Sequence, residues 1–342
     1  MSYKQIDVNS QLLGEQKLDL NNFNLSNNDS TYEKLSQTFD RINMKEIGPT
    51  TQNIHETIFE EDLSYIIEEI ANLIFKELNE GKEQVVIKRH VIDHINKISS
   101  QEIYNWLMNN QINSNSVYLF GYFNYHGIGT NINKQKAFEL FQRAAELGNN
   151  IAQLDLSSMY IHGKDVDKDH NIAFELSKKL VEKENPNAMN RLGYCFEIGI
   201  GTDVDLQKAF EMYQKAANLG NMIAQCNLGL FYKNGRAVAQ DYEKAFDLFK
   251  TSAEGGFSGG ISMLGRCHYL GIGTSINKQK AFELYLKAAS MGNYVAQYNL
   301  ANMYVRGDYV EKDINRAIYW YKRSAEQGSQ WAQLKLKSIL KD

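Results

Sequence analysis

The chain has 342 residues and carries 37 Lys and Arg against 41 Asp and Glu, so its net charge of -4 excludes the strongly basic surface typical of nucleic-acid-binding proteins. It is 43% hydrophobic and 23% charged, and its two prolines favour helices because proline is the strongest helix breaker. No run reaches the roughly 20 apolar residues that cross a bilayer, and three scattered cysteines are too few for a disulfide framework or a four-thiolate zinc site. We therefore expect a cytoplasmic helical protein without cofactor, bound metal, nucleic-acid partner or membrane insertion.

Residues 1–52 predict a disordered arm. They are rich in Asn, Ser, Gln and Asp, most clearly in the run NNFNLSNNDS at 21–30. Such a segment has too few apolar side chains to offset the entropy lost on ordering.

Residues 56–115 predict a helical extension that covers the N-terminal end of the remaining chain. The apolar spacing indicates a first helix that ends near Gly81 and a second over 83–98, and a capping box from Ser99 to Glu102 opens a third. The side chains predicted to face inward in the second and third helices are Val91, Ile95, Ile98, Ile103, Trp106 and Leu107.

Residues 116–341 predict six repeats of 36 residues followed by a C-terminal capping helix at 329–341. Glycine recurs at one position of the period: Gly127, Gly163, Gly199, Gly235, Gly271 and Gly307. Alanine recurs at another: Ala137, Ala173, Ala209, Ala245, Ala281 and Ala317. A fixed period of this length indicates a solenoid in which each repeat is stable only when stacked on its neighbours.

Each repeat predicts two helices, A and B. The predicted N-caps of helix B are Asn133, Asp169, Asp205, Asp241, Asn277 and Asp313. The small residues predicted to let helix A approach its neighbour are Gly121, Ser157, Gly193, Gly229, Gly265 and Ala301. The large residues that share one phase of helix B are Phe141, Tyr213, Phe249, Tyr285 and Tyr321. A local irregularity is expected at 180–187, where Glu184 replaces a capping glycine and Pro186 follows.

Two nearly identical stretches, GIGTNINKQKAFEL at 127–140 and GIGTSINKQKAFEL at 271–284, invite comparison with a phosphate-binding loop. Their spacing is not G-x-x-x-x-G-K-[ST]. The second glycine of the loop is replaced in other repeats by Asp165, Ala237 and Tyr309. We therefore interpret the stretch as the end of helix A followed by the cap of helix B.

The motif A-x-x-x-L-G-x-x-Y-x-x-G followed by D-x-x-K-A-F-x-x-x-x-x-A-A-x-x-G, best seen at 224–256 and 296–328, resembles the Sel1-like repeat. The resemblance implies an all-α fold, a right-handed alpha-alpha superhelical solenoid related to tetratricopeptide repeats. It also implies a non-catalytic adaptor or scaffold, for example in signalling, that binds peptide segments or folded domains of other proteins. Members of the family include subunits of ER-associated degradation complexes, activators of chitin synthase and tails fused to protein kinases.

Two alternatives remain open. In the first, the chain is a regulatory subunit or activator of a partner enzyme, either a protein kinase or a membrane-bound synthase such as chitin synthase, and residues 56–115 dock that enzyme. Less strongly, His90 and His94 at i, i+4 are candidates for the ligands of a metal-dependent enzyme. The stretch HVIDH lacks the Glu of H-E-x-x-H, so packing or solvated histidines are the preferred interpretation.

The resemblance places helix A on the concave face, where Tyr, Asn and Arg offer contact area and hydrogen bonds to a peptide. The predicted partner-binding residues are Tyr118, Tyr122, Tyr125, Asn190, Tyr194, Cys226, Leu230, Arg266, Tyr269, Tyr298 and Asn302. The alternative is that some of these tyrosines pack between repeats. Cys195 and Cys267 share a core phase with large apolar residues, which predicts two buried thiols.

Overall fold

The computed structural model describes residues 52–95, 99–163 and 165–339, and every regular element within these ranges is an α-helix. The chain divides into two compact units. One is residues 17–66, of which the structure describes 52–66, the beginning of one long helix. The described residues of the other unit are 67–95, 99–163 and 165–339, which contain the rest of that helix and the remaining helices. The arm predicted at 1–52 lies outside the described residues except for Gln52, with which the long helix begins.

Three helices precede the repeats, as predicted. α3 spans Gln52–Glu80, α4 spans Gln84–Ile95 and α5 spans Ser100–Asn109. α3 ends before Gly81, whose φ of 83° lies in the left-handed region that glycine adopts without strain. Of the side chains predicted to face inward, Val91, Ile95, Ile103 and Leu107 are buried, Trp106 is half-buried, and Ile98 lies outside the described residues.

The predicted capping box at Ser99 is wrong. Ser99 is the N-cap of α5, but its side chain is exposed and forms no capping hydrogen bond, so only its carbonyl accepts, from the N–H groups of Glu102 and Ile103. A capping box forms at the start of the next helix instead, where the side chains of Asn113 and Ser116 each accept from the other's backbone N–H. Asparagine serves as an N-cap as well as serine does, so a search for Ser-x-x-Glu missed this pair.

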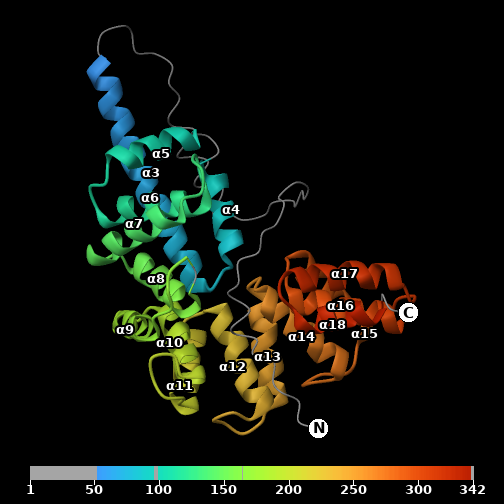
Figure 1. Cartoon of the computed structure of the whole chain (residues 1–342). Helices are drawn as coiled ribbons and strands as arrows, with labels where there is room; N and C mark the ends of the chain where they lie inside the picture. Colours follow the sequence, from blue (N-terminus) through green and yellow to red (C-terminus); the bar gives the residue numbers. More distant parts are fainter. Residues whose placement is uncertain (1–51, 96–98, 164, 340–342) are drawn as a thin grey trace. The chain divides into compact units, whose positions relative to one another are not determined.

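Six pairs of helices follow, and they confirm the predicted period. The A helices are α6 (Ser114–His126), α8 (Asn150–His162), α10 (Pro186–Ile198), α12 (Met222–Asn234), α14 (Ser258–Leu270) and α16 (Tyr294–Arg306). The B helices are α7 (Lys134–Glu146), α9 (His170–Val181), α11 (Leu206–Asn218), α13 (Tyr242–Glu254), α15 (Lys278–Ser290) and α17 (Ile314–Glu326). Each A helix packs against the B helix of its own repeat, and each B helix packs against the next A helix, so the repeats follow one another in chain order (Figure 1). The chain is therefore an α/α solenoid.

The ends of these helices are fixed by local chemistry. All six predicted N-caps of the B helices accept a hydrogen bond from the backbone N–H three residues later. All six predicted glycines after the A helices have a left-handed backbone. The C-terminal helix α18 (Gln330–Ile339) buries Ala332, as predicted for a seventh A helix, and leaves Lys335 and Lys337 exposed.

A glycine of helix A lies directly beneath an aromatic ring of helix B in several repeats. A Cβ atom placed on Gly229 would stand 2.7 Å from Cε1 of Phe249, and one on Gly193 would stand 2.9 Å from Cδ1 of Tyr213. Real Cβ contacts are never this short, so a larger residue would force the two helices apart. The ring opposite therefore accounts for four of the six predicted small residues, Gly121, Gly193, Gly229 and Gly265, whereas Ser157 faces Ser177 and Ala301 already carries a Cβ.

The second loop glycine also has a structural reason. A Cβ on Gly201 would stand 2.3 Å from the carbonyl oxygen of His170, and one on Gly273 would stand 2.1 Å from that of Tyr242. In the repeats that lack this glycine, Asp165, Ala237 and Tyr309 adopt the same left-handed backbone, with φ of 61°, 57° and 68°. This confirms the structural interpretation of the loop.

The irregularity expected at 180–187 is confined to one strained residue. α10 begins at Pro186, as predicted, and keeps the 36-residue period. Glu184 occupies the position of the capping glycines with a φ of 54°, which a residue with a Cβ adopts at a cost of roughly 1 kcal/mol. The backbone keeps its path, and the departure from the repeat is absorbed at Glu184.

Alanine at Gly273 tests the loop contact. We expect Gly273→Ala to lower the free energy of unfolding by about 2–4 kcal/mol, because the methyl group meets the Tyr242 carbonyl at a positive φ. The matched variant Ala237→Gly occupies the equivalent position and should change stability by less than about 1 kcal/mol, since relieved strain and added unfolded-state entropy offset each other. Urea unfolding followed by circular dichroism measures both; equal effects of the two substitutions would contradict the assignment.

Candidate partner-binding face

The predicted binding residues lie on the A helices. We call the surface of these helices that is not packed against B helices the A-helix face. Seven of the eleven predicted residues are at least partly accessible: Tyr125, Asn190, Leu230, Arg266, Tyr269, Tyr298 and Asn302. The other four are buried: Tyr118, Tyr122, Tyr194 and Cys226. That a partner contacts any of them stays a prediction, and the four buried side chains offer no surface to a partner in this structure.

Tyr118 and Tyr122 are buried in a polar cluster on the first three A helices. The Tyr118 hydroxyl donates to the half-buried carboxylate of Asp155 at 3.0 Å, and its ring lies 6.1 Å from that of Tyr122. Burial raises the pKa of Tyr122 well above its ordinary value, and the nearby charges of Asp155 and Glu77 add to the shift. Because Glu77 belongs to α3, the end of that helix lies close to the A-helix face here.

The turn after α3 continues along this face. Asn187 of α10 donates its side-chain N–H to the carbonyl of Leu78, and Asn221 at the start of α12 donates to the carbonyl of Asn79, both at 3.0 Å. Gly81 is packed so closely that a Cβ on it would stand 3.1 Å from the backbone nitrogen of Ile223. We call residues 78–83 the docked turn. Its backbone carbonyls, at the end of a helix, are held by asparagines of two successive A helices.

The docked turn reaches a third A helix through Glu83. The Glu83 carboxylate accepts from the backbone N–H of Ser258, the first residue of α14, at 3.1 Å. α14 has Phe257 at its N-cap, with no side-chain capping bond, whereas asparagine caps the other A helices at this position: Asn113, Asn149, Asn185, Asn221 and Asn293. Glu83 thus supplies a side-chain acceptor at the start of α14, at the first N–H of the helix rather than at the third, which the asparagines bind in the other repeats.

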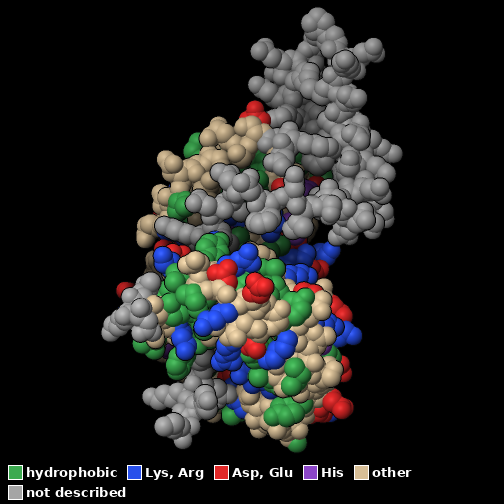
Figure 2. All heavy atoms as spheres, turned by 90° about the vertical axis from the view of Figure 1, so that its right-hand side faces the viewer, with side chains coloured by type: hydrophobic (Ala, Val, Ile, Leu, Met, Phe, Trp, Pro, Cys, Tyr) green, Lys and Arg blue, Asp and Glu red, His purple; other side chains and the backbone are tan. Residues whose placement is uncertain are grey.

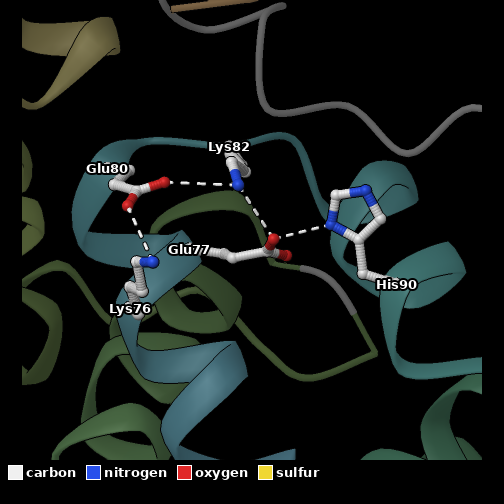
Figure 3. A network of polar contacts seen from close by, with 5 residues as sticks. All are labelled: Lys76, Glu77, Glu80, Lys82 and His90. Atoms are coloured by element: carbon white, nitrogen blue, oxygen red, sulfur yellow. Dashed lines mark hydrogen bonds and ion pairs between the residues drawn. The ribbon is translucent and has the colours of Figure 1, made fainter. Parts of the chain in front are cut away.

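A network of charges braces the docked turn between α3 and α4 (Figure 3). The Glu77 carboxylate accepts from Nζ of Lys82 at 2.8 Å and from Nδ1 of His90 at 2.6 Å, and Lys82 also pairs with Glu80 at 3.3 Å. Burial acts to raise the pKa of Glu77, but the hydrogen bonds from His90 and Lys82 outweigh it and lower the pKa. The turn is therefore preorganised by contacts with the residues of α3 and α4 on either side of it.

The two histidines considered as metal ligands contact different carboxylates. His90 bonds to Glu77, whereas Nε2 of His94 lies 3.5 Å from a carboxylate oxygen of Glu69. Both contacts join α4 to α3, which is the packing role preferred from the sequence. Within 52–95, 99–163 and 165–339, no group of three or more His, Cys, Asp and Glu side chains could hold a metal ion.

Beyond the docked turn, two cations stand unpaired on the A-helix face. Lys233 of α12 is half-buried, Arg266 of α14 is exposed, and neither side chain has a hydrogen bond or ion pair among the described residues. Burial and the charge of Arg266 lower the pKa of Lys233, so the two cations lie close enough to repel. On the side of the molecule that Figure 2 presents, basic, acidic and hydrophobic side chains are interspersed, and no broad basic field is visible on that side.

Tyr269 organises the next part of the face. Nζ of Lys278 lies 3.0 Å above the centre of its ring, and its hydroxyl donates to Asp308 at 2.5 Å and accepts from Arg306 at 3.1 Å. This predicted residue therefore has polar partners within the protein, and it holds two further cations near Arg266.

Sequence reasoning missed Asn187, Asn221, Glu83 and Lys233. Two signals were present in the sequence. Phe257 interrupts a series of asparagines at one position of the period, and Lys233 occupies the same position as the chosen Tyr125 and Tyr269. Nothing in the sequence indicated which segment would lie against Asn187.

The cysteines are confirmed as buried thiols. Cys195, Cys226 and Cys267 are free and buried, and burial raises their pKa values to about 12, 12 and 11. Cys226 was predicted to face a partner, but its thiol is enclosed between repeats and remains protonated at neutral pH.

Asp155 gives a pH-dependent prediction. Burial raises its pKa from 3.8 to about 6, although the Tyr118 hydrogen bond and the charge of Arg191 act to lower it. The folded state therefore favours the protonated carboxyl, and the stability that this group contributes below pH 4 is lost as the pH rises through 6. We expect Asp155→Asn to gain about 1–2 kcal/mol relative to the wild type between pH 4 and pH 7. Urea unfolding across this range measures the difference, and parallel pH profiles for the two proteins would contradict it.

Comparison with known proteins agrees with the fold. A family model described as Sel1 repeat matches residues 115–149, 150–185, 186–221, 223–257, 260–293 and 295–329. A search of curated proteins gives no match.

Two solved structures are similar to this chain. A Sel1 repeat protein from Oxalobacter formigenes is 27% identical, with a TM-score of 0.59, over 68% of this chain and 94% of that chain. The protective antigen c5321 of uropathogenic Escherichia coli strains, described as displaying an SLR fold, is 29% identical, with a TM-score of 0.49, over 74% of this chain and 57% of that chain.

No helix in the described part of the chain has the length and apolar character needed to cross a membrane. The repeats match the family model in six consecutive copies, and their caps and small residues follow the motif on which the resemblance was based. The chain therefore belongs to the Sel1 repeat family.

Proposed function

We propose that this protein is a non-catalytic adaptor that binds segments of other proteins on its A-helix face. One observation carries the proposal: the face already holds a peptide backbone. Asn187 and Asn221 donate to the carbonyls of Leu78 and Asn79, and the Ser258 N–H is bonded to Glu83. Side-chain amides that grip main-chain carbonyls recognise a peptide whatever its sequence, which suits an interaction surface.

The open part of the face favours an acidic partner segment. Lys233 and Arg266 are adjacent cations without partners in the described residues, and placing them together is unfavourable unless a negative charge binds between them. Tyr298 and Asn302 on the next A helix are half-buried and add aromatic and polar contact area. We propose that carboxylates of the partner lie against Lys233 and Arg266.

The adaptor role is favoured over that of an enzyme-activating subunit. That alternative assigned residues 56–115 to docking a partner enzyme. The docked turn, at the end of α3, instead contacts the A helices of its own chain. Three buried free thiols suit a reducing compartment, so we propose that the adaptor acts in the cytoplasm.

Reversing the two cations tests the proposal. We expect Lys233→Glu with Arg266→Glu to reduce at least tenfold the recovery of crosslinked partner proteins on the immobilised chain, because like charges then face the acidic segment. The thermal melting curve should change little, since neither side chain makes an ion pair within the described residues. Quantitative crosslinking mass spectrometry measures recovery, and circular dichroism measures melting.

A matched control uses the B helices. Lys215→Glu with Lys250→Glu makes the same change of charge on exposed residues of α11 and α13, away from the A-helix face. This variant should recover partners as the wild type does. Equal recovery by both charge-reversed variants would refute the assignment of the A-helix face.

A further inference from the structure

We propose that the docked turn, residues 78–83, is an intramolecular ligand of the A-helix face, and that an external partner enters by displacing it. The external ligand is a helix end followed by an acidic residue, the chemistry of the docked turn itself. This inference rests on the proposed function and adds to it the regulation of the site.

The docked turn is bound by three consecutive repeats, as a peptide ligand would be. α10 contributes Asn187, α12 contributes Asn221 and α14 contributes the N–H of Ser258, so each A helix along the face supplies one donor. The first two donors bind main-chain carbonyls, which any peptide has, and only the third requires a particular side chain. The site therefore selects two adjacent carbonyls at a helix end and a carboxylate four residues after the second.

α14 is built to receive a carboxylate from outside the repeats. The other A helices, α6, α8, α10, α12 and α16, cap themselves with asparagine, whereas Phe257 leaves the first N–H groups of α14 without a side-chain acceptor of their own. The helix end that lacks a cap is the one that Glu83 reaches, across 175 positions of sequence. A stable repeat would retain its asparagine unless this helix end served another acceptor.

The docked state leaves polar groups unsatisfied, which favours displacement. Oδ1 of Asn79, within the turn, and Oε2 of Glu77, next to it, are buried without a hydrogen-bond partner among the described residues. Burial also raises the pKa of Glu83, so its charged form is disfavoured where it sits. Groups buried in this way lower the stability of the contact that buries them. Departure of the turn returns them to water.

Tethering sets the strength that a partner needs. A ligand on the same chain competes at an effective concentration on the order of millimolar, so weak external segments are excluded. A partner overcomes this by making additional contacts, and Lys233 and Arg266 offer them farther along α12 and α14, the helices whose first residues hold the docked turn. The two parts of the face thus act in sequence: the open cations bind first, and the docked turn then yields.

A labelled peptide tests the inference. The probe is fluorescein-labelled NLIFKELNEGKEQVVIK, residues 72–88, and the receptor is the full chain. The turn variant Gly81→Val with Glu83→Gln weakens docking within the chain and leaves every donor on the A helices intact. Fluorescence anisotropy should give a Kd for the turn variant at least tenfold lower than for the wild type, because the wild-type site is occupied.

Two controls identify the contacts. The same peptide with Gln at the position of Glu83 should bind the turn variant about fivefold more weakly, since a charge-assisted hydrogen bond is lost. Adding Asn187→Ala to the turn variant should also weaken binding of the original peptide about fivefold, because one donor to the peptide backbone is lost. Adding Asn299→Ala should leave the Kd unchanged, since Asn299 is an asparagine of an A helix that does not contact the turn. Equal Kd values for wild type and turn variant, or binding indifferent to Glu83, overturn the inference.

If the turn variant does not fold, hydrogen exchange of the wild-type chain tests whether the docked turn leaves the A-helix face. Amides of 78–83 and the first turn of α14 should exchange together, with at least tenfold lower protection than amides of α12. Protection equal to that of α12 means that the turn leaves only on global unfolding, which overturns the inference. The charge-reversed Lys233 and Arg266 variant separates the two proposals. If this variant loses partner recovery but the peptide-binding and hydrogen-exchange results are negative, the displacement of the docked turn is refuted and the adaptor function is still supported.

Discussion

The close contact between a small residue of helix A and the side chain opposite it on helix B, in most repeats an aromatic ring, sets the distance between the two helices. Gly121, Gly193, Gly229 and Gly265 lie under Phe141, Tyr213, Phe249 and Tyr285. Repeat two has serine on both sides, and Ser157 and Ser177 bond to each other at 2.8 Å, so a hydrogen bond replaces the ring where the ring is absent. In repeat two both positions change, because the distance between the helices depends on the combined size of the two side chains; in repeat six Ala301 adds only one methyl group opposite Tyr321.

The same rings connect the core to the A-helix face. The hydroxyl of Tyr213 donates to Glu197 at 2.7 Å, and that of Tyr321 donates to Asn302 at 2.8 Å. A tyrosine in this position therefore packs against a small residue and orients a polar side chain on the neighbouring surface. Chemistry on the A-helix face is thus held by the packing beneath it, which limits how far a partner can rearrange it.

The period, the helices and their caps could be predicted from the sequence because each depends on residues within one repeat. An N-cap such as Asp241 bonds to an N–H three residues away, and the left-handed glycines close the helix that precedes them. The site was predicted only in part, because its contacts join residues far apart: Asn187 is 109 positions from Leu78, and Asn221 is 142 from Asn79. The burial of Tyr118 and Tyr122 was missed for the same reason, since Glu77 of α3 lies close to Tyr122. Repeat position alone could not show which tyrosines another segment would cover.

Departures from the repeat are informative because the other copies show what the fold requires at that position. Glu184 replaces a glycine and keeps the backbone at a φ of 54°, so this departure is tolerated as local strain. Phe257 replaces an asparagine, yet α14 begins in the same place as its equivalents, and Glu83 supplies an acceptor for its first N–H. A departure without strain thus has its explanation in another segment. Lys233 and Arg266 are a different case, because their two positions hold varied side chains from repeat to repeat and the fold prescribes none of them. Such positions can change without cost to the solenoid, which is why the partner-binding role proposed for the A-helix face is placed there.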